Sequence, residues 1–263
     1  MSAKISIIMG VYNCATTLPE AIDSLLAQTC QSWKLIMCDD GSKDDTYAVA
    51  ESYREKYPDK IVLIRNEGNK GLNYTLNHCL QYADTEYIAR MDGDDISLPT
   101  RLEKELAFLE EHNEYAIVSA PMVYFDEEGD FRTGVGGGEP SLKGMVTGTP
   151  FCHAPCMVRK EAYDAVGGYA DRKDRLRVED WDLWIRMYEK GFKGYNLSEP
   201  LYKMRDDRNA KSRRKFKYRI NEMKVGASAV KKLKLPFWHY FRTLRPIIVG
   251  LLPGPLYRKL HKH

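Results

Sequence analysis

Short apolar runs alternate with amphipathic segments of helix length along the first 120 residues. Ile5-Ser6-Ile7-Ile8-Met9 is rich in β-branched residues and predicts a buried strand. Thr17-Leu18-Pro19-Glu20 has the spacing of a capping box and an early proline, so a helix is expected from there to about Gln28. The same order repeats, with strands expected at 34–38, 61–65, 87–91 and 116–120 and helices at 44–57, 72–83 and 99–112. Strands that alternate with helices predict an α/β fold with a mostly parallel central sheet and helices on both faces.

The pattern changes after Val123, where glycine-rich and irregular sequence precedes shorter elements. A helix is expected at 179–190, because its apolar side chains have the spacing of a core-facing stripe. A second helix is expected at 215–234, followed by an aromatic, proline-broken and basic segment. These changes predict one domain over 1–205, whose parts 1–121 and 122–205 form two sides of a cleft, and a basic helical tail over 206–263.

Charge is distributed unevenly along the chain. The formal net charge is +3, but residues 201–263 contain 18 Lys and Arg against three acidic residues, so the remainder is acidic. A basic tail indicates an anionic partner, either a membrane surface or nucleic acid. Trp238, Tyr240, Phe241 and Tyr257 favour a membrane interface over nucleic acid, which is not an expected partner. Since no run reaches the ~20 apolar residues that span a bilayer, attachment to the membrane surface is predicted.

The six cysteines are scattered along the chain. The start of the chain contains only a strand-length apolar run, which is not a secretory signal. Free thiols in a reducing cytoplasm are therefore expected. Cys152, His153 and Cys156 lack a second Cys or His pair at finger spacing, which disfavours a zinc site.

Three carboxylates follow the run that ends at Met91. Asp92, Asp94 and Asp95 surround Gly93, and like charges this close repel unless a cation joins them. A hard divalent metal is therefore predicted there, and a solvated turn is the alternative. A calcium loop of EF-hand type is excluded, because Ser97 occupies the position that requires glycine.

Two further polar groups follow the first two predicted strands. Tyr12 and Asn13 end the first strand, and Asp39 and Asp40 end the second. An aromatic ring beside carboxylates suits a nucleobase, since the ring stacks and a carboxylate accepts a ring N–H. A turn that starts a helix is the alternative for Asp39-Asp40-Gly41-Ser42.

The last acidic group is Glu179-Asp180-Trp181-Asp182, at the start of a predicted helix. Negative charge there complements the helix dipole, so capping is one interpretation. The other is catalysis, in which Trp181 and Trp184 form apolar walls and a carboxylate deprotonates a hydroxyl.

Together these groups resemble the inverting family-two glycosyltransferases with the GT-A type fold, over about residues 4–205. The matching segments are Val11-Tyr12-Asn13, Asp39-Asp40-Gly41-Ser42, Asn69-Lys70-Gly71-Leu72, Arg90-Met91-Asp92-Gly93-Asp94-Asp95, Gly167-Gly168-Tyr169 and Glu179-Asp180-Trp181-Asp182. The resemblance implies a single GT-A type domain with a Rossmann-like sheet, a nucleotide-sugar-binding half at 1–121 and an acceptor-binding half at 122–205.

The resemblance also implies roles for individual residues. Asp180 is the expected general base, and Asp94 the expected ligand of Mg²⁺ or Mn²⁺. His153, Glu179, Trp181 and Asp182 are expected at the acceptor or pocket. The expected nucleotide-binding residues are Val11, Tyr12, Asn13, Asp39, Asp40, Asn69, Gly71, Arg90, Asp92 and Gly93.

The implied activity is the transfer of one sugar, with inversion, from a UDP-sugar to a glycan or a polyprenyl-diphosphate-linked acceptor in bacterial surface polysaccharide synthesis. The expected location is the cytoplasm, on the inner face of the plasma membrane. Two departures from the pattern stand out. Leu76-Asn77 stands where many relatives carry an arginine, and no Gln-x-x-Arg-Trp follows Asp180, which favours single addition over processive synthesis.

Two other functions fit parts of the sequence. A metal-dependent sugar-nucleotide pyrophosphorylase is also α/β, but it requires a basic, glycine-rich loop after the first strand, where this chain has no Lys or Arg until Lys34. A module that binds nucleic acid or membrane through the basic tail is the second alternative.

Overall fold

The computed structural model describes residues 3–206, 208 and 215–251. Contacts between residues divide the chain into two compact units. The first, here called the sheet unit, contains residues 1–139, 151–169 and 192–210. The second, the helical unit, contains residues 140–150, 170–191 and 211–263. The tail helices thus share a unit with 140–150 and 170–191, and the predicted division at residue 205 stays a prediction.

A seven-stranded sheet in the order β10-β6-β9-β4-β1-β2-β3 forms the centre of the sheet unit. Its strands are β1 (Ile5–Val11), β2 (Trp33–Asp39), β3 (Ile61–Arg65), β4 (Tyr87–Arg90), β6 (Ile117–Ser119), β9 (Cys156–Arg159) and β10 (Gly194–Asn196). Strands β4, β1, β2 and β3 pair in parallel, as do β10 and β6, while β9 is antiparallel to both of its neighbours. The predicted α/β fold with a mostly parallel sheet is confirmed.

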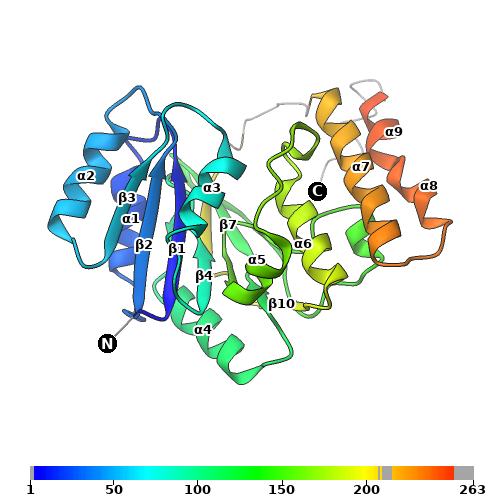
Figure 1. Cartoon of the computed structure of the whole chain (residues 1–263), viewed down its shortest axis with the longest axis horizontal. Helices are drawn as coiled ribbons and strands as arrows, with labels where there is room; N and C mark the ends of the chain where they lie inside the picture. Colours follow the sequence, from blue (N-terminus) through cyan, green and yellow to red (C-terminus); the bar gives the residue numbers. More distant parts are fainter. Residues whose placement is uncertain (1–2, 207, 209–214, 252–263) are drawn as a thin grey trace. The chain divides into compact units, whose positions relative to one another are not determined.

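Helices cover both faces of this sheet. Side chains alternate along its strands, so each buried strand presents apolar residues to both faces. Ile5, Ile7 and Met9 of β1 pack in one core with apolar residues of α1 (Leu18–Leu26) and α4 (Arg101–Glu111). Gly10 faces the opposite side, where a Cβ atom would lie 3.0 Å from Cγ2 of Thr75 in α3 (Leu72–Leu80). Figure 1 shows α3 and α1 on opposite faces of the sheet, with α2 (Thr46–Lys56) beyond β3.

A second sheet of four strands, in the order β5-β11-β7-β8, was not predicted. It consists of β5 (Ile96–Ser97), β7 (Met122–Asp126), β8 (Gly129–Thr133) and β11 (Tyr202–Arg205). Strand β11 is antiparallel to β5, which directly follows the carboxylate cluster. Residues about 110 positions apart in sequence thereby become neighbours. Helix α5 (Lys160–Val166) completes the unit.

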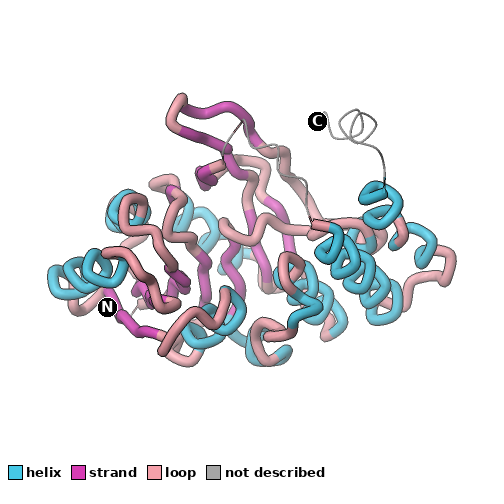
Figure 2. The backbone as a smooth tube through the Cα atoms, turned by 90° about the horizontal axis from the view of Figure 1, so that it is seen from above, coloured by secondary structure: helices cyan, strands magenta, loops and turns pink. Residues whose placement is uncertain are grey.

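The described part of the helical unit consists of helices and loops, without a strand (Figure 2). Its elements are η1 (Gly144–Val146), η2 (Lys173–Arg175), α6 (Glu179–Glu189), α7 (Phe216–Lys232), α8 (His239–Thr243) and α9 (Arg245–Leu251). Val146, Val178, Trp181 and Ile185 form its core with Val225, Ala229 and Val230 of α7. Helices α8 and α9 lie alongside α7 (Figure 1).

Most elements expected over the first 120 residues occur within a few residues of their predicted bounds, and α6 and α7 confirm the helices expected at 179–190 and 215–234. The capping box at Thr17 is wrong, because its side chain makes no cap hydrogen bond and instead donates to the carbonyl oxygen of Gly93 (3.0 Å). Within 3–206, 208 and 215–251, no helix is long and apolar enough to cross a bilayer. Tyr257, part of the predicted membrane segment, lies outside the described residues.

Candidate active site

The loops after β1 and β2 are joined to each other at the carboxyl edge of the sheet. Asn13 has a positive φ of 50°, and its backbone N–H donates to Oγ of Ser42 (3.0 Å) while its Oδ1 accepts from the backbone N–H of Lys43 (2.9 Å). Val11 is buried, whereas Tyr12 is 42% exposed. In open parallel sheets, ligands bind at the carboxyl ends of the strands, and the exposed Tyr12 ring lies at this edge, where it can stack on a ligand.

Asp39 lies fully buried beneath this edge. Its Oδ1 accepts from the backbone N–H of Ser42 (3.1 Å), and its Oδ2 lies 2.9 Å from Nε of Arg65. The Arg65 guanidinium is half exposed and stacks over the ring of Tyr47. Sequence reasoning missed Arg65, although a basic residue at the end of a predicted strand was a usable signal.

Asp40 holds the loop that follows β3. One carboxylate oxygen accepts from Asn66 Nδ2 (2.8 Å) and from the backbone N–H of Lys70 (2.8 Å), and the other accepts from the backbone N–H of Gly71 (2.9 Å). Asn69 is exposed in this loop, and Gly71 has a φ of 90° that favours glycine. Asp40 thus supports the loop, and its predicted contact with a nucleobase stays a prediction.

The Arg90-to-Asp95 segment gathers charge at the end of β4. Arg90 is buried, and its guanidinium lies 2.5 Å from Oδ1 of Asp92. Asp94 is exposed, and both partial desolvation and the charge of Asp92 raise the pKa of its carboxyl group. Asp95 is buried, and desolvation together with Asp92 raises its pKa to about 7. A Cβ atom at Gly93 would lie 3.0 Å from Val11 Cγ1, so this turn has no room for a side chain.

This charge distribution fits a divalent cation at Asp94. Desolvation first, and repulsion by Asp92 second, raise the pKa of the Asp94 carboxyl group, and a bound cation would offset both effects. In the described ranges, no three His, Cys, Asp or Glu side chains converge as a metal cage. A hard cation here would therefore take most of its oxygen ligands from water and from a bound phosphate group.

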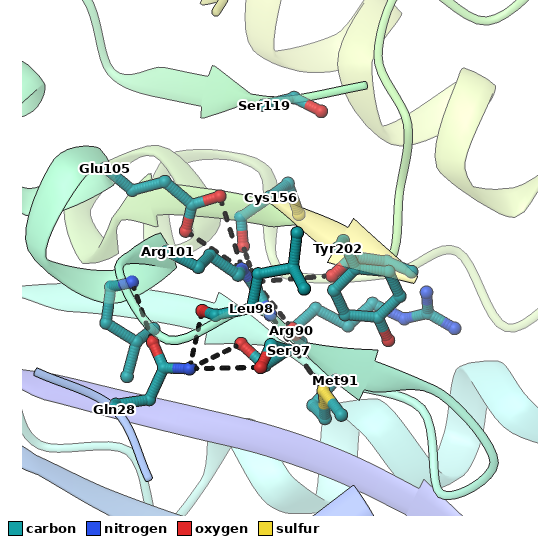
Figure 3. A network of polar contacts seen from close by, with 12 residues as sticks. Gln28, Arg90, Met91, Ser97, Leu98, Arg101, Glu105, Ser119, Cys156 and Tyr202 are labelled. Atoms are coloured by element: carbon teal, nitrogen blue, oxygen red, sulfur yellow. Dashed lines mark hydrogen bonds and ion pairs between the residues drawn. The ribbon is translucent and has the colours of Figure 1, made fainter. Parts of the chain in front are cut away.

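A buried ion pair lies next to Arg90 and Met91, which lead into the carboxylate segment (Figure 3). Arg101 and Glu105 of α4 are both fully buried, and Nε of Arg101 lies 3.2 Å from the Glu105 carboxylate. Arg101 also donates to the carbonyl oxygen of Arg90 (2.8 Å). Tyr202, whose ring faces the Arg101 guanidinium, accepts from the backbone N–H of Asp92 (3.1 Å). The sequence signal was an Arg and a Glu four positions apart on the apolar face of a helix, and it was missed.

His153 lies in the sheet unit, in a chain of aromatic hydroxyl groups. Its Nε2 is 2.8 Å from Oη of Tyr169, which lies 3.1 Å from Oη of Tyr163. Burial, and secondly the charge of Arg90, keep the pKa of His153 well below its usual value. The ring is therefore neutral at physiological pH.

Asn77, which stands near the position where many relatives carry an arginine, positions Tyr169. Its side-chain amide donates to the carbonyl oxygen of Tyr169 and accepts from the backbone N–H of the same residue, both at 2.8 Å. Gly168 has a φ of 71°, and a Cβ atom there would lie 2.5 Å from Oδ1 of Asn77. Asn77 therefore fixes the Gly167-Gly168-Tyr169 segment.

The acidic group at 179–182 belongs to the helical unit, in the first turn of α6. Asp180 and Trp181 line a cavity of about 280 Å³. Trp181 also donates through Nε1 to the carbonyl oxygen of Met145 (2.6 Å). Trp184 is fully buried and is not among the residues that line this cavity, so its expected place as a wall beside Asp180 stays a prediction.

Asp182 and Glu179 differ from Asp180 in their surroundings. Asp182 is buried, and its two oxygens accept from Nε of Arg175 (2.6 Å) and Nε of Arg186 (2.7 Å). This double ion pair connects η2 with α6, which is a structural contact. Glu179 is half-buried, and the expected pocket roles of Asp182 and Glu179 stay predictions.

Comparison with known proteins identifies the family. Residues 6–167 match the model of the family described as "Glycosyl transferase family 2". EpsE of Bacillus subtilis, which carries a glycosyltransferase name, is 46% identical over 98% of this chain and 93% of its own. The amylovoran biosynthesis glycosyltransferase AmsE of Erwinia amylovora is 30% identical over 76% of this chain and 75% of its own. WfaP of Escherichia coli, a UDP-Glc:α-D-GlcNAc-diphosphoundecaprenol β-1,3-glucosyltransferase, is 28% identical over 84% of each chain.

Solved structures show the same fold at low sequence identity. S. aureus TarS (residues 1–349), in complex with UDP-GlcNAc, aligns with a TM-score of 0.72 and 20% identity over 92% of this chain and 70% of that chain. The mannosyltransferase PcManGT of Pyrobaculum calidifontis, in complex with GDP-Man and Mn²⁺, aligns with a TM-score of 0.64 and 15% identity over 99% of this chain and 79% of that chain. The chain belongs to glycosyltransferase family 2 and has the GT-A type fold.

Proposed function

We propose that this glycosyltransferase transfers one sugar, with inversion, from a UDP-sugar to a hydroxyl group of a lipid-linked glycan in bacterial surface polysaccharide synthesis. The observation that carries the proposal is the polar edge of the sheet, where Tyr12, Asp39 and Asp94 occupy the ends of neighbouring parallel strands. AmsE and WfaP support the polysaccharide context through their named activities.

The donor nucleotide would bind over the ends of β1 and β2. The exposed Tyr12 ring would stack on the base, and the Asp39 carboxylate would accept a ring N–H. Asn69 and Gly71, on the loop held by Asp40, and Arg90, Asp92 and Gly93 would contact the ribose and diphosphate region. Uridine is supported by the TarS complexes with UDP and UDP-GlcNAc.

Asp94 would hold Mg²⁺ or Mn²⁺ together with oxygens of the donor diphosphate, a role supported by the Mn²⁺ complex of PcManGT. When bound, the cation supplies Lewis-acid stabilisation of the charge on the departing nucleoside diphosphate. The buried Arg90–Asp92 pair and the Tyr202 hydroxyl hold the backbone on which Asp94 is carried.

Asp180 would be the general base. Its carboxylate would take the proton of the acceptor hydroxyl while that oxygen forms a bond to the anomeric carbon. The bond from that carbon to the diphosphate breaks in the same step, and its electron pair leaves with UDP. A single displacement of this kind inverts the anomeric configuration.

The proposed acceptor is supported by WfaP, and the proposed location by an apolar stripe on the helical unit. WfaP acts on a diphosphoundecaprenol-linked sugar. An apolar stripe of exposed residues follows α8 and α9: Phe237 just before α8, Phe241 in α8, Leu244 between the helices, and Ile248 and Leu251 in α9, with exposed fractions of 44–72%. Arg242 and Arg245 accompany the stripe in a strongly basic tail. An apolar stripe with basic neighbours fits the anionic inner face of the plasma membrane, reached from the cytoplasm.

The alternatives have less support. Membership of glycosyltransferase family 2 argues against a sugar-nucleotide pyrophosphorylase. The exposed aromatic and aliphatic stripe is unlike the polar, basic surface that binds nucleic acid.

The proposal is tested at Asp94, which is exposed and is therefore replaceable without loss of folding. UDP binding is measured by isothermal titration calorimetry with Mn²⁺ and with EDTA. We expect Mn²⁺-dependent binding that Asp94→Asn weakens at least about tenfold, the effect of losing one charged ligand, with an unchanged melting temperature. Asp130→Asn, at an exposed aspartate of β8, is the control. Full transfer activity in EDTA would contradict the metal role.

A further inference from the structure

The cavity beside Asp180 is lined from four segments of the helical unit. Thr147, Gly148 and Thr149 come from the loop after η1, and Arg177 and Val178 directly precede α6. Arg219 and Glu222 come from α7, and Arg245, Pro246 and Val249 from α9. Its volume of about 280 Å³ lies below the roughly 300–1,000 Å³ of sites that enclose drug-sized ligands. The cavity therefore suits a small group of atoms rather than a whole nucleotide sugar.

The charged lining consists of three guanidinium groups and the carboxylates of Asp180 and Glu222. Arg219 is buried and lies 4.0 Å from the Glu222 carboxylate, so its charge is offset inside the cavity. Within the described ranges, Arg177 and Arg245 have no ion-pair partner, although both line the cavity. One planar guanidinium group can donate two parallel hydrogen bonds to two phosphate oxygens. The guanidinium groups of Arg177 and Arg245 in one small cavity therefore favour an anion with several phosphate oxygens.

Helix α9 connects the cavity with the apolar stripe. Arg245, Pro246 and Val249 line the cavity, while Ile248 and Leu251 of the same helix are exposed. Gly250 lets the helix approach Arg219 closely, since a Cβ atom there would lie 2.6 Å from Cδ of Arg219. A ligand with its anionic group in the cavity could thus continue along an apolar helix face.

We propose that this cavity binds the diphosphate of an isoprenoid-linked acceptor, with Arg177 and Arg245 on the phosphate oxygens and the isoprenoid chain along the stripe of α8 and α9. The proposal rests on the proposed function, because Asp180 would then act on the sugar attached to that diphosphate. It names a second diphosphate site, separate in its residues from the donor site at Asp94. Arg177 and Arg245 would be acceptor-binding residues, not groups that react.

The test uses the full chain, with geranyl diphosphate as the probe and EDTA present, so that metal-dependent donor binding is absent. Isothermal titration calorimetry gives the Kd. We expect Arg245→Ala and Arg177→Asn each to raise that Kd at least about tenfold, the loss of one charge-assisted hydrogen bond. Asn is chosen at position 177 because Arg177 has a φ of 68° and Asn tolerates this conformation. Lys224→Ala, an exposed charge elsewhere on α7, is the matched control.

The outcomes separate this site from the donor site. Asp94→Asn should weaken UDP binding in Mn²⁺ at least about tenfold and leave geranyl diphosphate binding intact. Arg245→Ala should weaken geranyl diphosphate binding at least about tenfold and leave UDP binding in Mn²⁺ intact. If only UDP binding is unchanged by Asp94→Asn, the assignment of the donor site is wrong, and the proposal for the acceptor cavity is unaffected. An unchanged Kd in Arg245→Ala would overturn the cavity proposal.

Two further arms identify the source of the phosphate. Inorganic diphosphate should bind more weakly than geranyl diphosphate, because it lacks the apolar chain. Vesicles of phosphatidylglycerol should bind with little dependence on Arg177. If the vesicles bind through Arg177 and Arg245 while geranyl diphosphate does not bind, the cavity binds phospholipid headgroups and the acceptor assignment is wrong. Melting temperatures of all variants check that each one folds.

Discussion

Asp92, Asp94 and Asp95 are within four residues of one another, and the fold places each carboxylate in different surroundings. Asp92 is paired with the buried Arg90, and Asp95 is buried and accepts from the backbone N–H of Arg205 (2.8 Å). Asp94 is the most exposed member, while the Asp92 side chain is 28% exposed. One cluster thus contains a buried supporting carboxylate, Asp95, and two carboxylates with surface open to a ligand.

Asp180 is the proposed general base, and its basicity can be removed by one substitution. Asp180→Asn keeps the size of the side chain and removes its basicity, so we expect near-normal donor binding and transfer slower by a factor of at least ~100. Donor affinity is measured by calorimetry, and turnover and the anomeric configuration of the product by NMR.

The neighbouring carboxylate provides the comparison. If Glu179→Gln loses more transfer than Asp180→Asn, the base is Glu179. An equal loss of donor affinity in Asp180→Asn, or a product that retains the anomeric configuration of the donor, would contradict the proposed step.

At the scale of elements, α4 supports the site through contacts with the strands. Gln28 at the end of α1 donates to Oγ of Ser97 (3.1 Å) and to the carbonyl oxygen of Leu98 (2.8 Å), and it accepts from the backbone N–H of Leu102 (3.0 Å). It thereby caps the first turn of α4, a task that Thr100 does not perform. Arg101, paired with Glu105, then connects this helix with the end of β4 through the carbonyl oxygen of Arg90 (Figure 3).

The Glu105 carboxyl yields a pH-dependent prediction. Desolvation, only partly opposed by Arg101, raises its pKa to about 7, above the usual 4.5. Between pH 4.5 and 7 the Glu105 carboxyl group therefore stays protonated in the folded chain, whereas it loses its proton in the unfolded chain. The resulting stability is present below pH 4.5 and is lost as the pH rises through 7.

Glu105→Gln cannot titrate, so the wild-type chain should gain stability relative to this variant as the pH falls from about 8 to 5. The expected gain is on the order of 2 kcal/mol, from the size of the pKa shift. Urea unfolding at several pH values measures it, with the exposed Glu111→Gln on the same helix as the control. The opposite trend would mean that attraction to Arg101 outweighs desolvation.

At the scale of the whole molecule, charge and exposed apolar surface are concentrated toward the carboxyl-terminal end. The stripe of α8 and α9 is surrounded by a strongly basic sequence, and the helices keep their inner faces on α7. Gly226 of α7 lets η1 and α8 approach this helix closely, since a Cβ atom there would lie 2.5 Å from the carbonyl oxygen of Val146 and 3.3 Å from Cγ2 of Thr243. The stripe can therefore face a partner without unfolding the unit.

Flotation with liposomes tests the membrane surface as that partner. The full chain should float with phosphatidylglycerol vesicles, and less so in high salt, which screens the basic residues. Phe241→Ser combined with Ile248→Ser should leave the protein at the bottom of the gradient, whereas Val135→Ser, at a fully exposed apolar residue of the sheet unit, should not. A folded wild-type chain that stays at the bottom would remove the membrane proposal.

The local pattern of the sequence determined the alternating strands and helices of the first 120 residues and the polar groups that end them. Apolar periodicity and turn residues act over a few positions, so Tyr12, Asp39 and Asp92 could be assigned to strand ends directly. Parallel pairing then puts such ends on one edge. The cluster around Gly93 was readable for the same reason, because its charges are adjacent in the chain.

Only the tertiary structure decided what surrounds those residues. The contact between Asp95 and Arg205 spans 110 positions, and the contact between Asn77 and Tyr169 spans 92. The burial of Arg101 with Glu105 and the cavity shared by Asp180 and Arg245 likewise join distant segments. Such contacts depend on strand order and on how α7 and α9 pack, and no local periodicity encodes either. The sequence therefore determined the elements and the chemistry at their ends, while the packing of distant segments decided which carboxylates can meet a ligand and which support the fold.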